Sequence, residues 1–149
     1  MSDLRTFNKN QKLNSTDKKE IVDFLYNHLE QFGDPKEDIE KCIDYSLQEH
    51  PSFGGFTPAY YNNSQLLGVV IVNRTGMKGF IPENLLVYIA THNKHRGKGI
   101  GKKLMEEAIK LTEGNIALHV EPNNPAKGLY EKLGFTNKYL EMRLIKDSK

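Results

Sequence analysis

The amino-acid sequence predicts a single-domain α/β (α+β) fold in which one mixed central sheet is flanked by helices. Three observations lead to this prediction. The chain has 149 residues, which is the common size of one domain. Apolar residues have helical spacing in the first third of the chain, and strand patterns alternate with helical ones from Phe56 onward. No apolar run is long enough to span a bilayer, so we expect no contact with a membrane.

Two helices are expected before the first strand. The first should begin at Asp17 and Glu20, which have capping-box spacing, and end at Gly33. The second should begin at Asp34-Pro35, with Glu37 completing its capping box. Both carry an apolar residue at every fourth position: Ile21, Leu25 and Leu29 in the first helix, and Ile39, Ile43 and Leu47 in the second.

Strands are expected next. The runs Phe56–Tyr61 and Gln65–Asn73 flank the turn-forming residues 62–64, so they indicate a hairpin. A third strand is expected at Asn84–Thr91, where the run Leu-Leu-Val-Tyr-Ile-Ala is apolar at every position. Such a run is typical of a strand that is covered on both faces.

The last third of the chain alternates between helix and strand patterns. A short helix is expected after the cap residue Asn124, and Gly134 should end it. The expected elements are the helix Gly99–Leu111, the strand Asn115–Glu121, the helix Pro125–Leu133 and the strand Tyr139–Ile145.

Charge is distributed unevenly along a chain of net charge +2. Residues 1–50 contain 11 Asp or Glu and 7 Lys or Arg, whereas residues 94–149 contain 7 Asp or Glu and 12 Lys or Arg. The small net charge argues against a dedicated nucleic-acid binder, and the local basic excess favours a compact phosphate-bearing ligand. The single cysteine, Cys42, excludes an intrachain disulfide framework and is expected in the core. With no apolar signal core at the start, we expect a cytoplasmic protein.

The segment Arg96–Gly101 reads Arg-Gly-Lys-Gly-Ile-Gly and lies between the most apolar strand and a helix. Glycines let the backbone approach a ligand, and free amides at a helix N-terminus favour phosphates. The spacing fits neither a P-loop nor a dinucleotide-binding fingerprint. A glycine-rich connector is the other interpretation. Five basic residues surround the turn: Lys94, Arg96, Lys98, Lys102 and Lys103.

A second motif strengthens the ligand-binding interpretation. Residues 123–135 read Asn-x-x-Ala-x-x-x-Tyr-x-x-x-Gly-Phe, about two dozen residues after Arg-x-x-Gly-x-Gly. The two motifs in this order resemble the GNAT superfamily of acyl-CoA-dependent N-acyltransferases. The resemblance covers residues 65–145 and implies an N-acetyltransferase domain over residues 1–149, with 65–145 as the acetyl-CoA-binding core and 1–50 as a helical substrate-side region.

The resemblance also implies roles for individual residues. The loop amides would hold the pyrophosphate of coenzyme A, the end of the preceding strand would pair with its pantetheine arm, and Asn123 and Ala126 would line its other side. Tyr130 would lie near the sulfur as general acid, or else simply pack beside Leu129 and Leu133. The implied acetyl-CoA-binding residues are Ile89, Ala90, Thr91, Arg96, Gly97, Lys98, Gly99, Ile100, Gly101, Lys102, Asn123, Ala126 and Tyr130.

The general base is less clearly indicated. Many relatives carry a carboxylate in the middle of the strand before the loop, where residues 85–88 read Leu-Leu-Val-Tyr. Glu83 is the nearest substitute, and Glu121 and His119 are alternatives, although each also fits an ordinary surface, loop or strand position. His92 and His95 are expected in the coenzyme loop or on the surface. No histidine pattern supports a metal site.

These observations predict direct acetyl transfer from acetyl-CoA to a primary amine of a small molecule or peptide. The alternative is a catalytically silent acyl-CoA sensor or partner-binding module. We expect the acceptor to be cationic, and we expect no nucleic-acid partner. A homodimer is left open. The expectation of a cationic acceptor rests on five acidic residues of the leading helices, which equally fit a solvated helix face: Glu37, Asp38, Glu40, Asp44 and Glu49.

Overall fold

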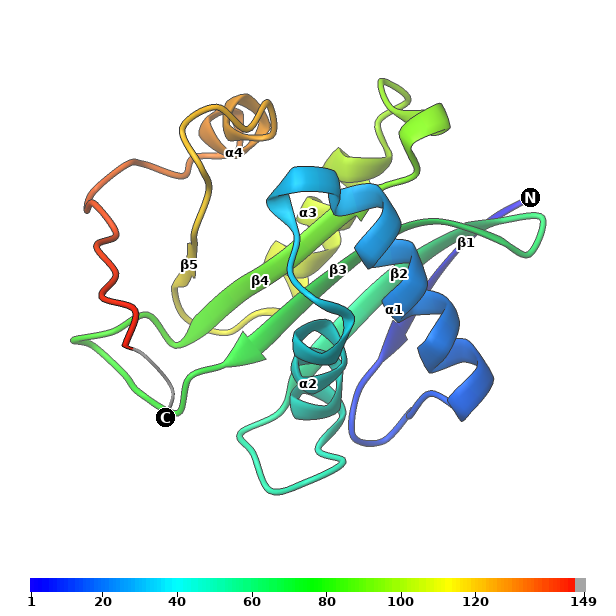
Figure 1. Cartoon of the computed structure of the whole chain (residues 1–149), viewed down its shortest axis with the longest axis horizontal. Helices are drawn as coiled ribbons and strands as arrows, with labels where there is room; N and C mark the ends of the chain where they lie inside the picture. The colour runs from blue at the N-terminus through cyan, green and yellow to red at the C-terminus, as the bar shows by residue number, and fades with distance from the viewer. Residues whose placement is uncertain (147–149) are drawn as a thin grey trace. The chain divides into compact units, whose positions relative to one another are not determined.

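The computed structural model describes residues 1–146 (Figure 1). The chain forms two compact units, of which the first spans Met1–Leu118 and the second begins at His119. Among residues 1–146, no helix combines the length and apolar composition needed to cross a membrane.

The first unit is built on a mixed sheet that has five strands among the described residues. The strand order is β1-β2-β3-β4-β5. All neighbouring strands are antiparallel except β4 and β5, which are parallel. The strands are β1 (Ser2–Phe7), β2 (Gly55–Asn62), β3 (Gln65–Arg74), β4 (Asn84–Thr91) and β5 (Ile116–Leu118). The predicted hairpin and the third predicted strand are therefore confirmed.

Helices cover both faces of this sheet, as predicted (Figure 1). Helices α1 and α2 pack over one face, where their apolar residues join the core formed with the sheet. Helix α3 lies on the other face, where a Cβ at Gly68 of β3 would come 2.7 Å from Leu104 of α3. The helices of this unit are α1 (Ser15–Leu29), the short 3-10 helix η1 (Glu30–Phe32), α2 (Lys36–Leu47), the 3-10 helix η2 (Asn93–His95) and α3 (Ile100–Leu111).

The apolar spacing places the expected residues in the core. Every predicted stripe residue of α1 and α2 except the half-buried Leu29 is fully buried. Burying each of these side chains contributes roughly 1.5–3 kcal/mol. Strand β3 is buried at eight of its ten positions because helices cover both of its faces. Cys42 packs against the same core, as predicted, and burial raises the pKa of its thiol to about 12.

Both predicted caps of the leading helices are wrong. Helix α1 begins at Ser15, and its cap is Asn14, whose side-chain oxygen accepts a hydrogen bond from the amide of Asp17 at 2.7 Å. Pro35 takes the cap position of α2, and Asp34 makes no cap bond. A helix cap is a residue of extended backbone whose short polar side chain accepts a hydrogen bond from a free amide in the first turn. Asn14 has this conformation and accepts the bond from Asp17, three residues later.

Strand β1 was not predicted. Its first four residues are exposed, so the strand lacks the apolar alternation that marks a half-buried strand. It nevertheless pairs with β2 from Ser2 opposite Asn62 to Phe7 opposite Thr57. Edge strands of this kind are held by backbone pairing, and they tolerate charged side chains.

The second unit contains helix α4 (Lys127–Lys132), which is shorter than predicted. The Asn124 side chain accepts a bond from the Ala126 amide at 2.9 Å, and Gly134, at φ 102°, follows the helix end. The predicted strand Tyr139–Ile145 is wrong, since residues 135–146 form no strand. Of the strand predicted at Asn115–Glu121, only the three residues of β5, Ile116–Leu118, form a strand. A strand needs a partner for its backbone and a surface for its apolar face, and the apolar side chains of 139–145 are exposed.

Candidate functional site

The sheet of the first unit parts in the middle of β4. Pairing between β4 and β5 ends where Leu86 lies opposite Leu118, and β4 continues to Thr91. The register with β3 also shifts here, because Val87 is a bulge between Leu86 and Tyr88. Within residues 1–118, the second half of β4 therefore pairs with β3 alone and leaves backbone groups on its other edge. Such an edge can pair with an extended ligand.

The predicted pantetheine residues occupy this half of β4. Ile89, Ala90 and Thr91 are its last three residues. The chain then passes through η2 and the exposed loop 96–99 into α3. The structure thus places the predicted strand segment and the predicted glycine loop in one continuous stretch of the first unit.

The start of α3 has the properties of an anion site. Gly99 occupies the cap position in a left-handed conformation (φ 82°), and no side chain bonds the helix end. A Cβ built at Gly97 or Gly99 would meet no atom within 4 Å, so the space beside the loop is open in the first unit. Gly101 and Lys102 lie in the first turn, which contains no acidic residue. Free amides and the helix dipole together favour a phosphate at this position.

A stack of histidines fixes the loop to the end of α1. The His28 and His92 rings lie 4.3 Å apart, and His95 packs edge-on against His92 at 5.1 Å. The amide of Asn93 donates to His28 Nδ1 at 3.1 Å, and the Arg96 guanidinium donates to the His28 carbonyl at 2.9 Å. Burial, followed by the neighbouring His92 and Arg96, lowers the pKa of His28. A neutral His28 therefore anchors Asn93 and Arg96, the residues that lead into the glycine loop.

Glu83 lies just before β4, at the end of that strand remote from the glycine loop. Its carboxylate accepts hydrogen bonds from the amides of Asn115 at 2.6 Å and Gly79 at 3.1 Å. These backbone bonds lower the pKa of Glu83. The carboxylate therefore holds two loops together, and a lowered pKa makes it a weaker proton acceptor. The structure does not bring Glu83 and the glycine loop together.

The second motif lies entirely in the second unit. Asn123 precedes the turn that starts α4, Ala126 caps the helix, and Tyr130 is buried within it. The Tyr130 and Phe135 rings lie 6.1 Å apart. Burial raises the pKa of the Tyr130 hydroxyl to about 12, so it stays protonated at neutral pH. The alternative bases also belong to this unit, where His119 and Glu121 are exposed.

The acidic residues of the leading helices are mostly paired with lysines. Lys18 lies 3.0 Å from Asp44 and 4.0 Å from Glu40. Lys12 and Lys41 pair with two more carboxylates, Glu49 at 3.1 Å and Asp38 at 3.8 Å. Of the five predicted acidic residues, only Glu37 has no lysine or arginine within 4.0 Å among the described residues. The expected negative surface is therefore largely neutralised.

Sequence reasoning missed a carboxylate above the middle of β4. The hydroxyl of Tyr88, a residue that is 8% exposed, donates a hydrogen bond to Asp34 Oδ2 at 2.5 Å. Asp34 lies between η1 and α2, far from Tyr88 in sequence. Its position before Pro35 suggested a helix cap, so only the folded structure reveals this contact. Burial, together with the bond to Asp34, raises the pKa of Tyr88, and the phenol remains a donor.

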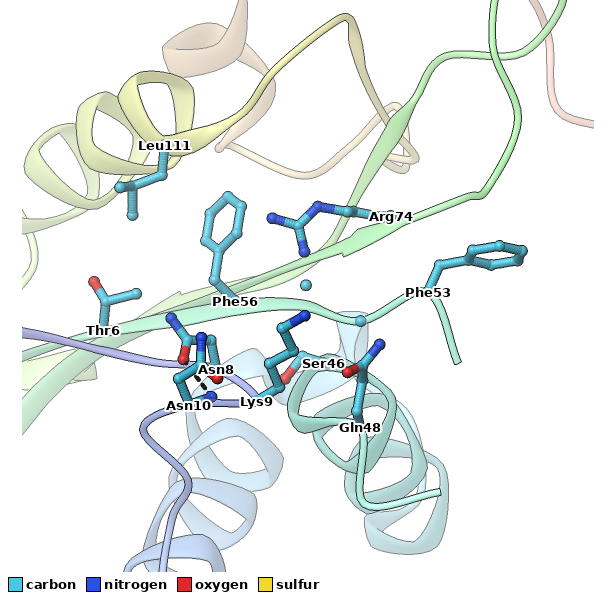
Figure 2. Close-up of a pocket in the computed structure, with 12 residues that line it drawn as sticks. Thr6, Asn8, Lys9, Asn10, Ser46, Gln48, Phe53, Phe56, Arg74 and Leu111 are labelled. Carbon is cyan, nitrogen blue, oxygen red and sulfur yellow. Dashed lines mark hydrogen bonds between the residues drawn. The ribbon is translucent and has the colours of Figure 1, made fainter. Parts of the chain in front are cut away.

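A separate hollow of about 210 Å³ lies in the first unit where β2 begins and β3 ends (Figure 2). Lys9 and Arg74 contribute positive charge to its lining, and Phe56 forms part of its wall. None of the residues predicted for acetyl-CoA or catalysis lines it. Among residues 1–146, no three His, Cys, Asp or Glu side chains are grouped as ligands for a metal ion.

Comparisons with known proteins agree with the geometry. The family described as acetyltransferase (GNAT) domain matches residues 55–137. A 5-NmdU N-acetyltransferase of Pseudomonas phage PaMx11 is 37% identical over 57 residues, which are 37% of this chain and 41% of that relative. The match thus spans less than half the length of this relative.

Solved structures share the fold. An aminoglycoside N-acetyltransferase, AAC(6')-Iy in complex with CoA, superposes with a TM-score of 0.71 at 16% identity, covering 99% of this chain and 96% of that one. A ribosomal-protein-alanine N-acetyltransferase from Brucella melitensis biovar Abortus 2308 gives a TM-score of 0.64 at 18% identity, covering 98% and 99%. At these identities the likeness concerns the fold.

Proposed function

The chain belongs to the GNAT family of N-acetyltransferases, and we propose that it transfers an acetyl group from acetyl-CoA directly to a primary amine of a small molecule or peptide. One observation carries this proposal. The half of β4 without a β5 partner leads, through the glycine loop, to the uncapped N-terminus of α3. An extended ligand with a phosphate group at one end suits this arrangement.

Different residues of the chain would bind different parts of acetyl-CoA. The amides from Arg96 to Lys102 would hold the pyrophosphate, and the backbone of Ile89–Thr91 would pair with the pantetheine arm. Asn123 and Ala126 would line the other side. When bound, acetyl-CoA supplies the acetyl group as a reactive thioester. The exposed loop and the open space beside Gly97 and Gly99 support this assignment.

Catalysis requires two proton movements and a hydrogen-bond donor. An amine with a pKa of ~10 must lose a proton before it can attack. Glu121 and His119 are the proposed acceptors of that proton, and Glu83 is a weaker candidate because its pKa is lowered. A backbone amide at the irregular part of β4 would stabilise the charge on the carbonyl oxygen. Tyr130 would give a proton to the departing sulfur. Its protonated state at neutral pH fits that role.

A second candidate function is an acyl-CoA sensor without catalysis. It is favoured by residues 85–88, which contain no carboxylate in the middle of β4. Two measurements separate the candidates. Calorimetry with acetyl-CoA tests binding, and release of free CoA thiol in the presence of mixed primary amines tests transfer. Binding with amine-dependent release supports the enzyme, and binding without release supports the sensor. Absence of binding contradicts both.

We propose a cytoplasmic protein whose 149 residues act as one N-acetyltransferase domain, either alone or as a homodimer. The acceptor would be a polyamine, an amino-acid-like metabolite, an antibiotic or a peptide terminus. Nucleic acid is not the expected ligand, because the basic excess is local and the net charge is only +2.

A further inference from the structure

We propose that Asp34 binds a second ammonium group of the acceptor, one that does not react, and so selects diamines and other cationic amines, with Tyr88 as the residue that positions Asp34. This inference rests on the proposed acetyl transfer and identifies a residue that recognises the acceptor. Its basis is the contact between the Tyr88 hydroxyl and the Asp34 carboxylate above the middle of β4.

Asp34 lies above the middle of β4, where Tyr88 holds its carboxylate. Tyr88 follows the bulge at Val87, where pairing between β4 and β5 has just ended. Its side chain rises on the face of the sheet covered by α1 and α2 and reaches Asp34 at 2.5 Å. The connection between the two helices thus brings a carboxylate over the point where the strands part. This is the region in which the transferred group is proposed to lie.

Among the described residues, no lysine or arginine lies within 4.0 Å of the Asp34 carboxylate. Lys36, two residues away, instead pairs with Asp23 at 3.0 Å and lies over the ring of Tyr26. The carboxylates of α2 are mostly paired with lysines, as described above. Asp34 therefore retains a negative charge that a ligand can use.

Asp34 is exposed, and Tyr88 occupies only its Oδ2 atom. No hydrogen bond engages Oδ1 within residues 1–146. The buried phenol fixes the orientation of the carboxylate, which reduces the entropy lost when a ligand binds. An ammonium group, with its compact charge and several donors, matches the free oxygen.

Three variants test this proposal. Asp34→Asn removes the charge but keeps an oxygen for the Tyr88 hydroxyl, and Tyr88→Phe removes only the hydroxyl. Asp34→Glu restores the charge on a longer side chain. The matched control is Glu106→Gln, which removes one negative charge from an exposed position on α3, across the sheet. Each full-length variant is assayed for CoA release with 1,4-diaminobutane and with β-alanine, and for acetyl-CoA affinity by calorimetry.

The expected result is specific to the acceptor. Asp34→Asn should raise the KM for 1,4-diaminobutane by about tenfold and leave kcat and acetyl-CoA affinity nearly unchanged. Tyr88→Phe should give a smaller increase, and Asp34→Glu should recover part of the loss. Activity with β-alanine should change little, and added salt should reduce the preference of the wild type for the diamine. Glu106→Gln should behave like the wild type.

Several results would overturn the inference. If the wild type acetylates the diamine and Asp34→Asn has an unchanged KM, Asp34 does not bind the acceptor, but the proposed transferase function stands. An equal loss in Glu106→Gln would indicate a diffuse charge effect. A loss of acetyl-CoA affinity in Asp34→Asn would indicate a structural role. If the wild type binds acetyl-CoA but acetylates no amine, the proposed transfer fails, and the inference fails with it.

Discussion

At the scale of single residues, two carboxylates beside β4, Glu83 and Asp34, differ in the hydrogen bonds that they accept. Glu83 accepts two backbone amide bonds, whereas Asp34 accepts one hydroxyl bond and keeps an oxygen free. Backbone bonds stabilise the ionised carboxylate and lower the pKa of Glu83, and the same bonds tie together the ends of two loops. The bonds of Glu83 fit a structural role, and the free oxygen of Asp34 fits the proposed binding of an acceptor.

This difference gives a prediction for Glu83→Gln. The variant keeps one side-chain oxygen but loses the charge that strengthens the bonds to Asn115 and Gly79. We expect a lower midpoint of thermal unfolding and a turnover number close to that of the wild type. Because the folded pKa of Glu83 is depressed, its contribution to stability is present at neutral pH and is lost on acidification. A large loss of turnover at unchanged stability would instead identify Glu83 as the base.

Tyr130 gives a second prediction. As general acid, its hydroxyl should contribute roughly 10²–10⁴-fold to turnover, so Tyr130→Phe should lower kcat by that factor and leave acetyl-CoA affinity intact. The matched control is Tyr139→Phe, which removes a hydroxyl from a tyrosine that is 79% exposed in the same unit. Calorimetry and steady-state CoA release check both variants. Near-normal turnover of Tyr130→Phe would show that Tyr130 is not the general acid and only packs beside Phe135.

At the scale of secondary-structure elements, the proposed binding of the coenzyme depends on the N-terminus of α3. Its first turn contains no acidic side chain, and no side chain caps it. Its apolar stripe, by contrast, is buried against the sheet through Ile100, Leu104 and Ala108. The helix is therefore anchored by one face and offers its amide end to a ligand.

The corresponding prediction concerns Gly101→Asp. The new carboxylate would place bulk and negative charge in the first turn of α3, against the proposed pyrophosphate. Acetyl-CoA affinity should fall at least tenfold, which corresponds to about 1.4 kcal/mol. Lys110→Gln is the control, because it makes the same helix one charge more negative at its other end. Calorimetry that finds equal affinity in both folded variants would contradict the anion site at α3.

The junction between α1 and the glycine loop gives a prediction about pH. His28 accepts the Asn93 amide at Nδ1, so protonation of that nitrogen would break the bond. Its folded pKa lies below the unfolded value of ~6.5, so between the two values the unfolded chain binds more protons. The contribution of His28 to stability is thus present above ~6.5 and is lost as the pH falls below that value.

Thermal unfolding between about pH 5 and pH 7.5 measures this effect. The advantage of the wild type over His28→Gln should be largest at the higher pH and shrink on acidification. His50→Gln, at an exposed histidine outside the junction, should show no such trend. The His28 ring also lies 4.5 Å from the Phe24 ring. A difference between wild type and His28→Gln that does not change with pH would show that His28 contributes only through this packing.

At the scale of the whole molecule, local sequence patterns predicted much of the fold. Apolar residues at every fourth position predicted the buried stripes of α1 and α2, and the apolar run at Asn84–Thr91 predicted both ends of β4 correctly. Patterns failed where tertiary contacts decide the outcome. Strand β1 is held by pairing with β2 and has little apolar alternation of its own. Alternating residues at 139–145 suggested a strand that the described structure does not contain.

The candidate site was predictable to a similar extent. Glycines and basic residues that adjoin in sequence indicated the loop at 96–101, because an anion site at a helix end is built from consecutive residues. The contact between Asp34 and Tyr88 joins positions separated by 54 residues. No local pattern encodes it, and the neighbouring proline favoured a cap instead. Two of the lysines that neutralise the acidic helices are likewise distant in sequence from their partners: Lys12 pairs with Glu49, and Lys18 pairs with Asp44.

The central claim is that this GNAT domain moves an acetyl group from acetyl-CoA to an amine. The most direct test supplies the protein with acetyl-CoA labelled in the acetyl group and a panel of primary amines, and follows the label by mass spectrometry. The account predicts that the label appears on an amine of the acceptor, with about one free CoA thiol released for each label transferred. Acetyl-CoA that binds but transfers no label to any amine of the panel would contradict it.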